Sequence, residues 1–112
     1  MQENLKRALQ DFINQAEQIY KNHIQQIILY GSYARGDYHA ESDVDIMVLV
    51  DLPQEALLEY RKQLMSRVFD INLQYDTMIV PVTVNAAHFH DWLPVYPFYQ
   101  NVMNEGVELF AA

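Results

Sequence analysis

The chain has 112 residues and a formal net charge of −8, with 51% hydrophobic and 20% charged residues. These values exclude a disordered chain and predict one folded domain over residues 1–112, too small to include a second substrate-binding domain. A surface this acidic is unsuited to direct binding of nucleic acid, where Lys and Arg must neutralise phosphates. It favours either a basic protein partner or a negative charge kept for solubility alone.

Membrane and disulfide-dependent classes are excluded as well. No apolar run approaches the ~20 residues that a membrane helix needs, and the N-terminus lacks the apolar centre of a signal peptide. The chain contains no cysteine, so it has no disulfide scaffold and no thiolate metal site. We therefore expect a cytoplasmic protein without a membrane anchor.

The first 30 residues predict a helix followed by a strand. Residues 3–20 have the three-to-four spacing of one apolar helical face, formed by Leu5, Leu9, Phe12, Ile13, Ala16, Ile19 and Tyr20. Nothing in this stripe resembles a binding motif, so we interpret it as core packing. A connection over residues 21–26 then leads to a first strand at Ile27–Tyr30.

A Gly-Ser turn follows this strand and opens a short helix or loop. Gly31 allows the backbone to come close to a ligand, and Ser32 offers a hydroxyl and an N–H to a phosphate. Arg35 is the cation closest in sequence, and its fork-shaped guanidinium suits a phosphate group. The alternative role for Arg35 is an ion pair with Asp37 or Glu41.

Two aspartates lie where the chain enters a second apolar strand. Because side chains alternate along a strand, Asp43 and Asp45 share one face. The residues that alternate with them along the strand are expected to point into the core: Val44, Ile46, Val48 and Val50. Two adjacent carboxylates repel each other unless a cation lies between them, and a divalent ion such as Mg²⁺ carrying nucleotide phosphates is the usual one. We expect Ser42 to orient the preceding loop through a hydrogen bond to the backbone.

The next two elements are a long helix and a third strand. Residues 54–75 have a helical apolar period, which outweighs the strand-like alternation of residues 70–75. Residues 78–84 are β-branched and apolar and predict a strand. Pro81 removes one ladder donor, which argues for an edge position or a bulge.

The C-terminal part is aromatic-rich and predicts a short helix near residues 98–104, a turn at Gly106 and a last short strand at 107–110. Its aromatic residues either cover the core or form a patch for a protein partner, so a homodimer or hetero-oligomer is an expected assembly. His88 and His90 are spaced to face one metal ion from a strand, but no third ligand lies nearby, which favours a loop or surface position.

The string GSYARGDYHAESDVDIMVLVD, at residues 31–51, combines Gly-Ser, ten intervening residues and Asp-x-Asp. It resembles the signature of the DNA polymerase beta-type nucleotidyltransferases. With its Ala-Arg-Gly and Ser42, it is similar to the minimal nucleotidyltransferase (MNT) domains found in MNT/HEPN toxin–antitoxin pairs. The likeness is strong over residues 24–51 and weaker over 80–84 and 97–109. It implies an α/β (α+β) fold with a small mixed sheet of three to four strands flanked by helices.

The resemblance also implies a site. Asp43 and Asp45 correspond to the catalytic metal ligands for Mg²⁺, with ATP as the nucleoside triphosphate substrate. The residues implied to hold the nucleotide are Gly31, Ser32, Arg35 and Ser42. Family members carry a third carboxylate on the following strand, where this chain has Val80. Asp76, just before that strand, is the alternative third ligand.

Three functions follow from the resemblance. The first is an antitoxin-type enzyme that transfers AMP from ATP to a hydroxyl group, expected to be a tyrosine, of a HEPN-family toxin. The second is an inactive antitoxin that neutralises its toxin by binding alone, which the missing third carboxylate favours. The third is a small-molecule nucleotidyltransferase of the aminoglycoside-modifying type, although those enzymes usually add a helical domain.

Overall fold

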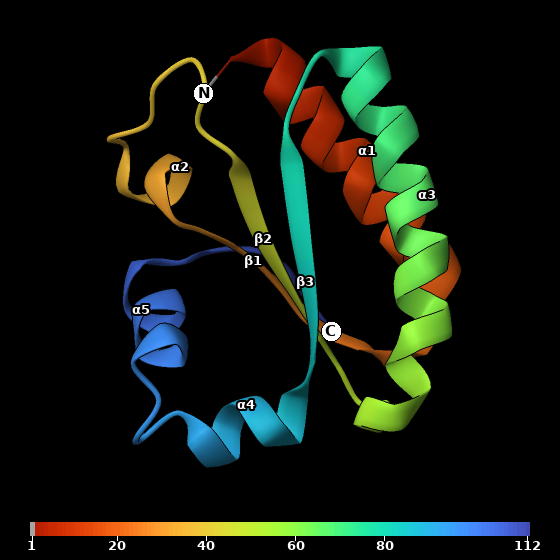
Figure 1. Ribbon diagram of the computed structural model, residues 1–112, viewed down its shortest axis with the longest axis vertical. Helices are drawn as coiled ribbons and strands as arrows, with labels where there is room; N and C mark the ends of the chain where they lie inside the picture. Colours follow the sequence, from red (N-terminus) through yellow and green to blue (C-terminus); the bar gives the residue numbers. More distant parts are fainter. Residues whose placement is uncertain (1) are drawn as a thin grey trace.

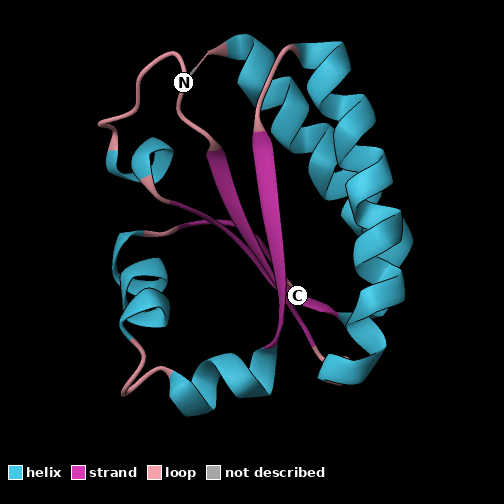
Figure 2. Ribbon diagram, viewed as in Figure 1, coloured by secondary structure: helices cyan, strands magenta, loops and turns pink. Residues whose placement is uncertain are grey.

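The structure is a computed structural model that describes residues 2–112, and it contains a four-stranded sheet with helices on both faces (Figures 1 and 2). The strands are β1 (Ile24–Tyr30), β2 (Val44–Val50), β3 (Ile79–Asn85) and β4 (Val107–Ala111). The helices are α1 (Glu3–Tyr20), α2 (Ser32–Arg35), α3 (Leu57–Tyr75), α4 (Ala86–Trp92) and α5 (Pro97–Glu105). The predicted α/β (α+β) class with a small mixed sheet is confirmed.

The strand order in the sheet is β3-β2-β1-β4. β1 pairs antiparallel with both β2 and β4, whereas β2 and β3 run parallel. A parallel pair needs a crossover, and α3 supplies it. β3 is an edge strand, so Pro81 occupies the position predicted for it, where a missing N–H donor is tolerated.

The helices form two layers around the sheet. α1 and α3 cover one face, and α4 and α5 cover the other (Figure 1). Alternate side chains of β2 serve the two sides: Ile46 and Val48 pack with α1 and α3, whereas Met47 and Leu49 pack with α4 and α5. Burial on both faces explains why β2 is apolar without interruption after Asp45.

Several boundaries differ from the prediction. β1 begins at Ile24, three residues before the predicted start, and the predicted helix over residues 54–75 begins with a 3₁₀ turn at Gln54–Ala56. The last helix and strand lie where they were expected. The segment after Asn85 contains an additional helix, α4, so His88 and His90 are on a helix and not in the loop that the sequence favoured.

His88 has structural contacts at the start of α4 and with α5. The Asn85 side chain caps α4 by accepting a hydrogen bond from the His88 N–H at 2.8 Å, and the His88 ring lies 2.9 Å from the Tyr99 hydroxyl. The His88 side chain therefore links α4 to α5 and has a structural role.

One surface of the molecule is unusually apolar. The outward face of α3 carries four large exposed side chains at helical spacing, Leu58, Met65, Phe69 and Leu73. We call these four residues the α3 stripe. Within residues 2–112, none of the helices combines the length and the apolar character that crossing a lipid bilayer requires.

Candidate active site

The connection from β1 to α2 places Gly31 directly against the carboxylate of Asp45. Gly31 has a φ of +73° and a ψ of −156°, a backbone conformation that is almost restricted to glycine. A Cβ atom added there would collide with the Asp45 Oδ2 atom. The backbone conformation therefore favours glycine here, and a larger residue would have to push the Asp45 carboxylate aside.

The two aspartates differ in their surroundings. Asp45 is half-buried on β2 and pairs with Tyr30 of β1, whereas Asp43 lies exposed just before β2. Burial, followed by the negative charge of Asp43, raises the pKa of Asp45 above its ordinary value, and Arg35 partly offsets this. Burial, with the charge of Asp45 adding to it, raises the pKa of Tyr30 to about 12. The electrostatic potential here is therefore suited to a cation.

A cavity of about 380 Å³ joins the sequence-predicted groups on one side of the sheet. Gly31, Ser32 and Arg35 line it from α2 and the preceding turn, and Asp45 lines it from β2. The opposite wall belongs to α5, which contributes Phe98, Asn101, Val102 and Glu105. The cavity therefore brings the predicted phosphate-binding residues and one predicted metal ligand together.

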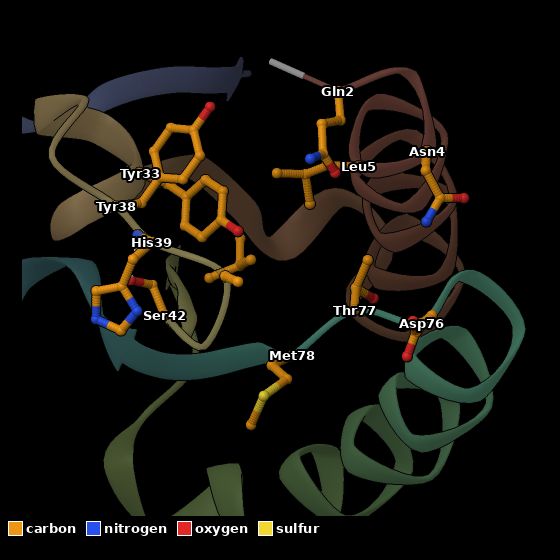
Figure 3. Close-up of a pocket in the computed structure, with 12 residues that line it drawn as sticks. Gln2, Asn4, Leu5, Tyr33, Tyr38, His39, Ser42, Asp76, Thr77 and Met78 are labelled. Atoms are coloured by element: carbon orange, nitrogen blue, oxygen red, sulfur yellow. Dashed lines mark hydrogen bonds between the residues drawn. The ribbon is translucent and has the colours of Figure 1, made fainter.

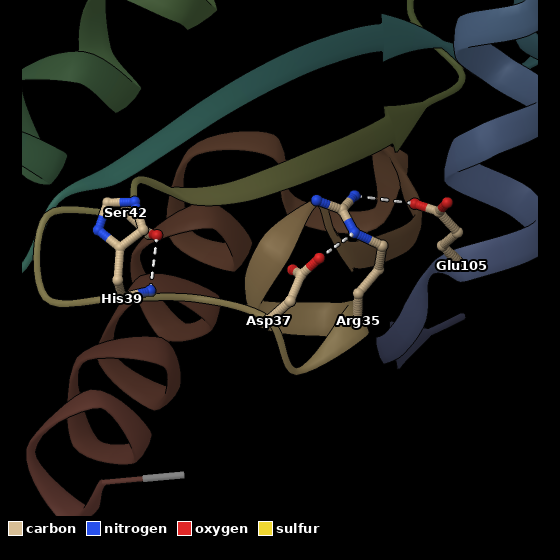
Figure 4. Close-up of polar contacts among 5 residues, drawn as sticks. All are labelled: Arg35, Asp37, His39, Ser42 and Glu105. Atoms are coloured by element: carbon tan, nitrogen blue, oxygen red, sulfur yellow. Dashed lines mark hydrogen bonds and ion pairs between the residues drawn. The ribbon is translucent and has the colours of Figure 1, made fainter.

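Arg35 is held by carboxylates from two parts of the chain (Figure 4). Its Nε donates to Asp37 Oδ2 at 3.2 Å, and its Nη1 donates to Glu105 Oε2 at 3.1 Å. The alternative ion pair with Asp37 thus forms, but the second partner is Glu105 rather than Glu41. Glu105 was missed from the sequence because no local pattern links it to a residue 70 positions away.

Ser42 closes the loop that leads into the first aspartate. The His39 N–H donates to Ser42 Oγ at 2.9 Å (Figure 4), and the Ser42 N–H donates to the His39 carbonyl at 3.0 Å. This agrees with the predicted loop-orienting hydrogen bond. Ser42 lines a different cavity from the one that contains Asp45. A contact of Ser42 with the nucleotide remains a prediction.

The second cavity, of about 410 Å³, lies beside the start of α1 and β3 (Figure 3). Asp76 lines it together with Ser42 and the stacked rings of Tyr33 and Tyr38, whose centroids are 4.1 Å apart. Asp76 itself is exposed at the end of α3, with a φ of 53°.

The structure does not join Asp76 to the aspartate pair. Among residues 2–112, no group of three or more His, Cys, Asp or Glu side chains is placed to hold a metal ion. The residue paired with Asp45 on β3 is Val80, as the predicted register requires, and its side chain is 41% exposed. The position expected for a third carboxylate is therefore occupied by an aliphatic side chain.

The donor groups at this site fit a hard divalent cation. Asp43 and Asp45 offer only oxygen ligands, and the raised pKa of Asp45 reflects burial and like charge that a bound cation would relieve. The absence of a Cβ at Gly31 lets the turn backbone lie close to the Asp45 carboxylate. Two carboxylates can hold one Mg²⁺ when phosphate oxygens complete its coordination.

Asp45 makes a testable contribution to stability. Its pKa is raised in the folded protein, so folding is favoured while Asp45 is protonated and loses that contribution as the pH rises through the folded-state pKa. Asp45→Asn should therefore be more stable than the natural chain at pH 7. The difference should disappear below about pH 4, the pKa of an unperturbed Asp.

Urea unfolding at both pH values measures this difference. Asp70→Asn, which changes an exposed aspartate on α3, is the matched control and should show neither the gain nor its pH dependence. Equal stability of Asp45→Asn and the natural chain at pH 7 would contradict the raised pKa of this carboxylate in the folded protein.

Comparison with known proteins assigns the chain to a family. Residues 9–96 match the family model described as a nucleotidyltransferase domain. Two relatives from Methanocaldococcus jannaschii share the name "Putative protein adenylyltransferase". One is 32% identical over 96% of this chain and 99% of its own length, and the other is 36% identical over 90% and 94%.

Solved structures agree with the fold. A toxin–antitoxin complex with AMP-PNP contains a chain with a TM-score of 0.54 and 24% identity, covering 90% of this chain and 72% of its own. An MntA-HpeT toxin–antitoxin mutant gives a TM-score of 0.53 at 22% identity, covering 89% and 71%. The likeness to these solved structures supports the fold alone. The family model and the two relatives support the assignment of the chain to a family. This chain belongs to the nucleotidyltransferase domain family, the enzyme family whose motif its sequence resembles.

Proposed function

We propose that this chain is a Mg²⁺-dependent protein adenylyltransferase that transfers AMP from ATP to a hydroxyl group of a HEPN-family toxin in the cytoplasm. The observation that carries the proposal is the contact of Gly31 with Asp45, because it places the predicted phosphate turn beside a predicted metal ligand. The names of the two relatives support protein as the acceptor. The toxin–antitoxin complexes among the structural neighbours support a toxin partner.

Each residue of the site has a defined task in this reaction. Asp43 and Asp45 hold Mg²⁺, while Gly31 and Ser32 contact the phosphates from the turn. Arg35 provides the positive charge beside the cavity. When bound, Mg²⁺ neutralises phosphate charge and helps to align the acceptor with the leaving group. The acceptor oxygen forms a bond to the α-phosphorus of ATP, the bond to the β-phosphate oxygen breaks, the hydroxyl proton passes to solvent, and pyrophosphate leaves.

Surface properties support a protein partner. The net charge of −8 suits a basic protein. The α3 stripe is an exposed apolar surface of the kind that marks protein contacts. We expect the toxin to use this helix face, since the apolar side chains of the α3 stripe stay exposed within residues 2–112.

A binding-only antitoxin is the second candidate. It is favoured by Val80, because an aliphatic residue stands beside Asp45 where a third carboxylate would complete a metal site. In this case the nucleotidyltransferase fold serves as a scaffold that blocks the toxin. The two candidates make opposite predictions for variants that keep the surface but lose the charge pair.

Growth of cells that co-express a HEPN-family toxin from the native host separates the two candidates. We expect the natural chain to restore growth and the Asp43→Asn/Asp45→Asn variant to fail, because both carboxylates are needed to hold the metal ion. Asp70→Asn/Asp91→Asn changes the charge equally at two exposed positions and should restore growth. Full protection by the Asp43→Asn/Asp45→Asn variant would favour binding alone.

A further inference from the structure

Arg35 is the only cationic side chain among the described residues that line the cavity, and it forms an ion pair with Glu105 on α5. Arg35 and Glu105 line the same cavity of about 380 Å³, Arg35 from α2 and Glu105 from α5. Their contact is 3.1 Å long, and Asp37 holds the other end of the same guanidinium at 3.2 Å (Figure 4). The side chains of Arg35 and Glu105 are 43% and 38% exposed, so this cavity-lining pair is partly open to solvent.

We propose that Glu105 is a positioning residue for nucleotide binding, which it serves by fixing the guanidinium of Arg35 at the cavity wall. This inference rests on the proposed function of the cavity as the site for the ATP phosphates. Glu105 does not contact the nucleotide in this proposal. It acts through Arg35, and its effect should disappear when Arg35 is absent.

The hydrogen-bonding capacity of Arg35 supports this role. A guanidinium has five N–H donors, and the contacts with Asp37 and Glu105 use one on Nε and one on Nη1. Donors on Nη1 and Nη2 therefore remain for a phosphate. A free arginine side chain loses rotamer entropy when it binds a phosphate. A guanidinium held at two points has already lost much of that freedom.

The position of Glu105 is itself fixed by close packing. The Gly106 N–H donates to the Val102 carbonyl at 2.9 Å at the end of α5. A Cβ at Gly106 would collide with this carbonyl and with the side chain of Ile28 on β1. The next residue, Val107, pairs with Leu29 of β1. The strand that leads into Gly31 therefore also anchors the end of the helix that carries Glu105.

The negative charge of Glu105 repels the phosphates, and the positive charge of Arg35 reduces this repulsion. A carboxylate in the cavity wall repels a triphosphate. At 3.1 Å from a guanidinium, however, most of that charge is offset locally. Mg²⁺ bound with the triphosphate reduces the remaining repulsion further. Positioning therefore outweighs repulsion, and removal of Glu105 should weaken nucleotide binding.

A double-mutant cycle on nucleotide affinity tests the proposal. The probe is α,β-methylene-ATP with Mg²⁺, which cannot release pyrophosphate, measured by isothermal titration calorimetry. We expect Glu105→Ala to raise the dissociation constant about 5-fold, the upper range for an exposed ion pair. Arg35→Ala should raise it about 10-fold or more, because it removes a hydrogen bond to a charged group. The double variant should bind as weakly as Arg35→Ala alone.

Two further variants separate positioning from damage to the fold. Glu105→Gln keeps an oxygen that accepts from Arg35, so we expect it to bind within about 2-fold of the natural chain. Asn104→Ala, at the adjacent exposed position of α5, should bind as the natural chain does. All variants should have the same melting temperature, because the Arg35–Glu105 pair is exposed.

The possible outcomes are distinct. Unchanged or tighter binding by Glu105→Ala would overturn the proposal, and so would a further loss when Glu105→Ala is added to Arg35→Ala. Both outcomes would leave the proposed function intact, because the natural chain binds the nucleotide in each. No binding by the natural chain would instead refute the proposed function, and this inference with it.

Discussion

Replacing Asp43 and Asp45 together with Asn is expected to lower the rate of AMP transfer by about 100-fold or more. The estimate follows from several kcal/mol of charge stabilisation by a correctly held metal ion, at about 1.4 kcal/mol for each factor of ten. Asn keeps the shape of Asp but removes the paired charge that holds Mg²⁺. Single-turnover transfer from ATP labelled at the α-phosphate measures the effect.

The control for this experiment is Asp70→Asn/Asp91→Asn. Both of these positions are exposed, on α3 and α4, and the net charge changes by the same amount. We expect its transfer rate to match that of the natural chain. A similar loss in both double variants would mean that overall charge, and not the pair beside Gly31, governs the reaction.

Gly31→Ala is expected to reduce both stability and nucleotide binding. Backbone strain at a φ of +73° and a ψ of −156° costs about 1–3 kcal/mol in the free energy of unfolding. The collision of the new Cβ with Asp45 adds to this cost and displaces the carboxylate from its position. Urea unfolding and titration with Mg²⁺ and α,β-methylene-ATP measure the two effects.

Gly36 provides a matched comparison because it also has a positive φ. Its φ is +87°, but a Cβ added there meets no atom within 4 Å. Gly36→Ala should therefore lose only the ~1–2 kcal/mol of left-handed backbone strain and should leave Asp45 in place. If both variants bind the nucleotide equally well, the approach of Gly31 to Asp45 has no role in binding.

Long periodic segments made most of the fold predictable. The apolar stripe of α1 repeats over five turns, so its predicted range of residues 3–20 matches the structure. α3 follows the same rule. β1 was predicted too short because the polar residues Gln25 and Gln26 interrupt its apolar run, whereas the structure places a bulge between Ile24 and Gln26.

The short helix α4 gave a weaker signal. It has seven residues and is followed closely by two prolines, so its apolar period is too brief to recognise. Asn85 is a good N-cap residue, and its side chain does cap α4. This cap is the local feature from which the helix could have been predicted.

The candidate site was predictable only where its residues are close in sequence. Gly31, Ser32 and Asp45 lie within 15 positions of one another, and alternation along β2 fixes the direction of Asp45. Glu105 reaches the cavity because β4 pairs with β1 and so brings the end of α5 beside α2. No short-range pattern carries that information.

The central claim is that this chain transfers AMP to a toxin and needs Asp43 and Asp45 to do so. Intact-mass spectrometry of a HEPN-family toxin from the native host, after incubation with this protein, ATP and Mg²⁺, tests the claim most directly. The account predicts a mass gain of one or more AMP units that is lost with Asp43→Asn/Asp45→Asn. A toxin of unchanged mass, bound tightly by both proteins, would contradict the claim and leave the fold as a binding scaffold.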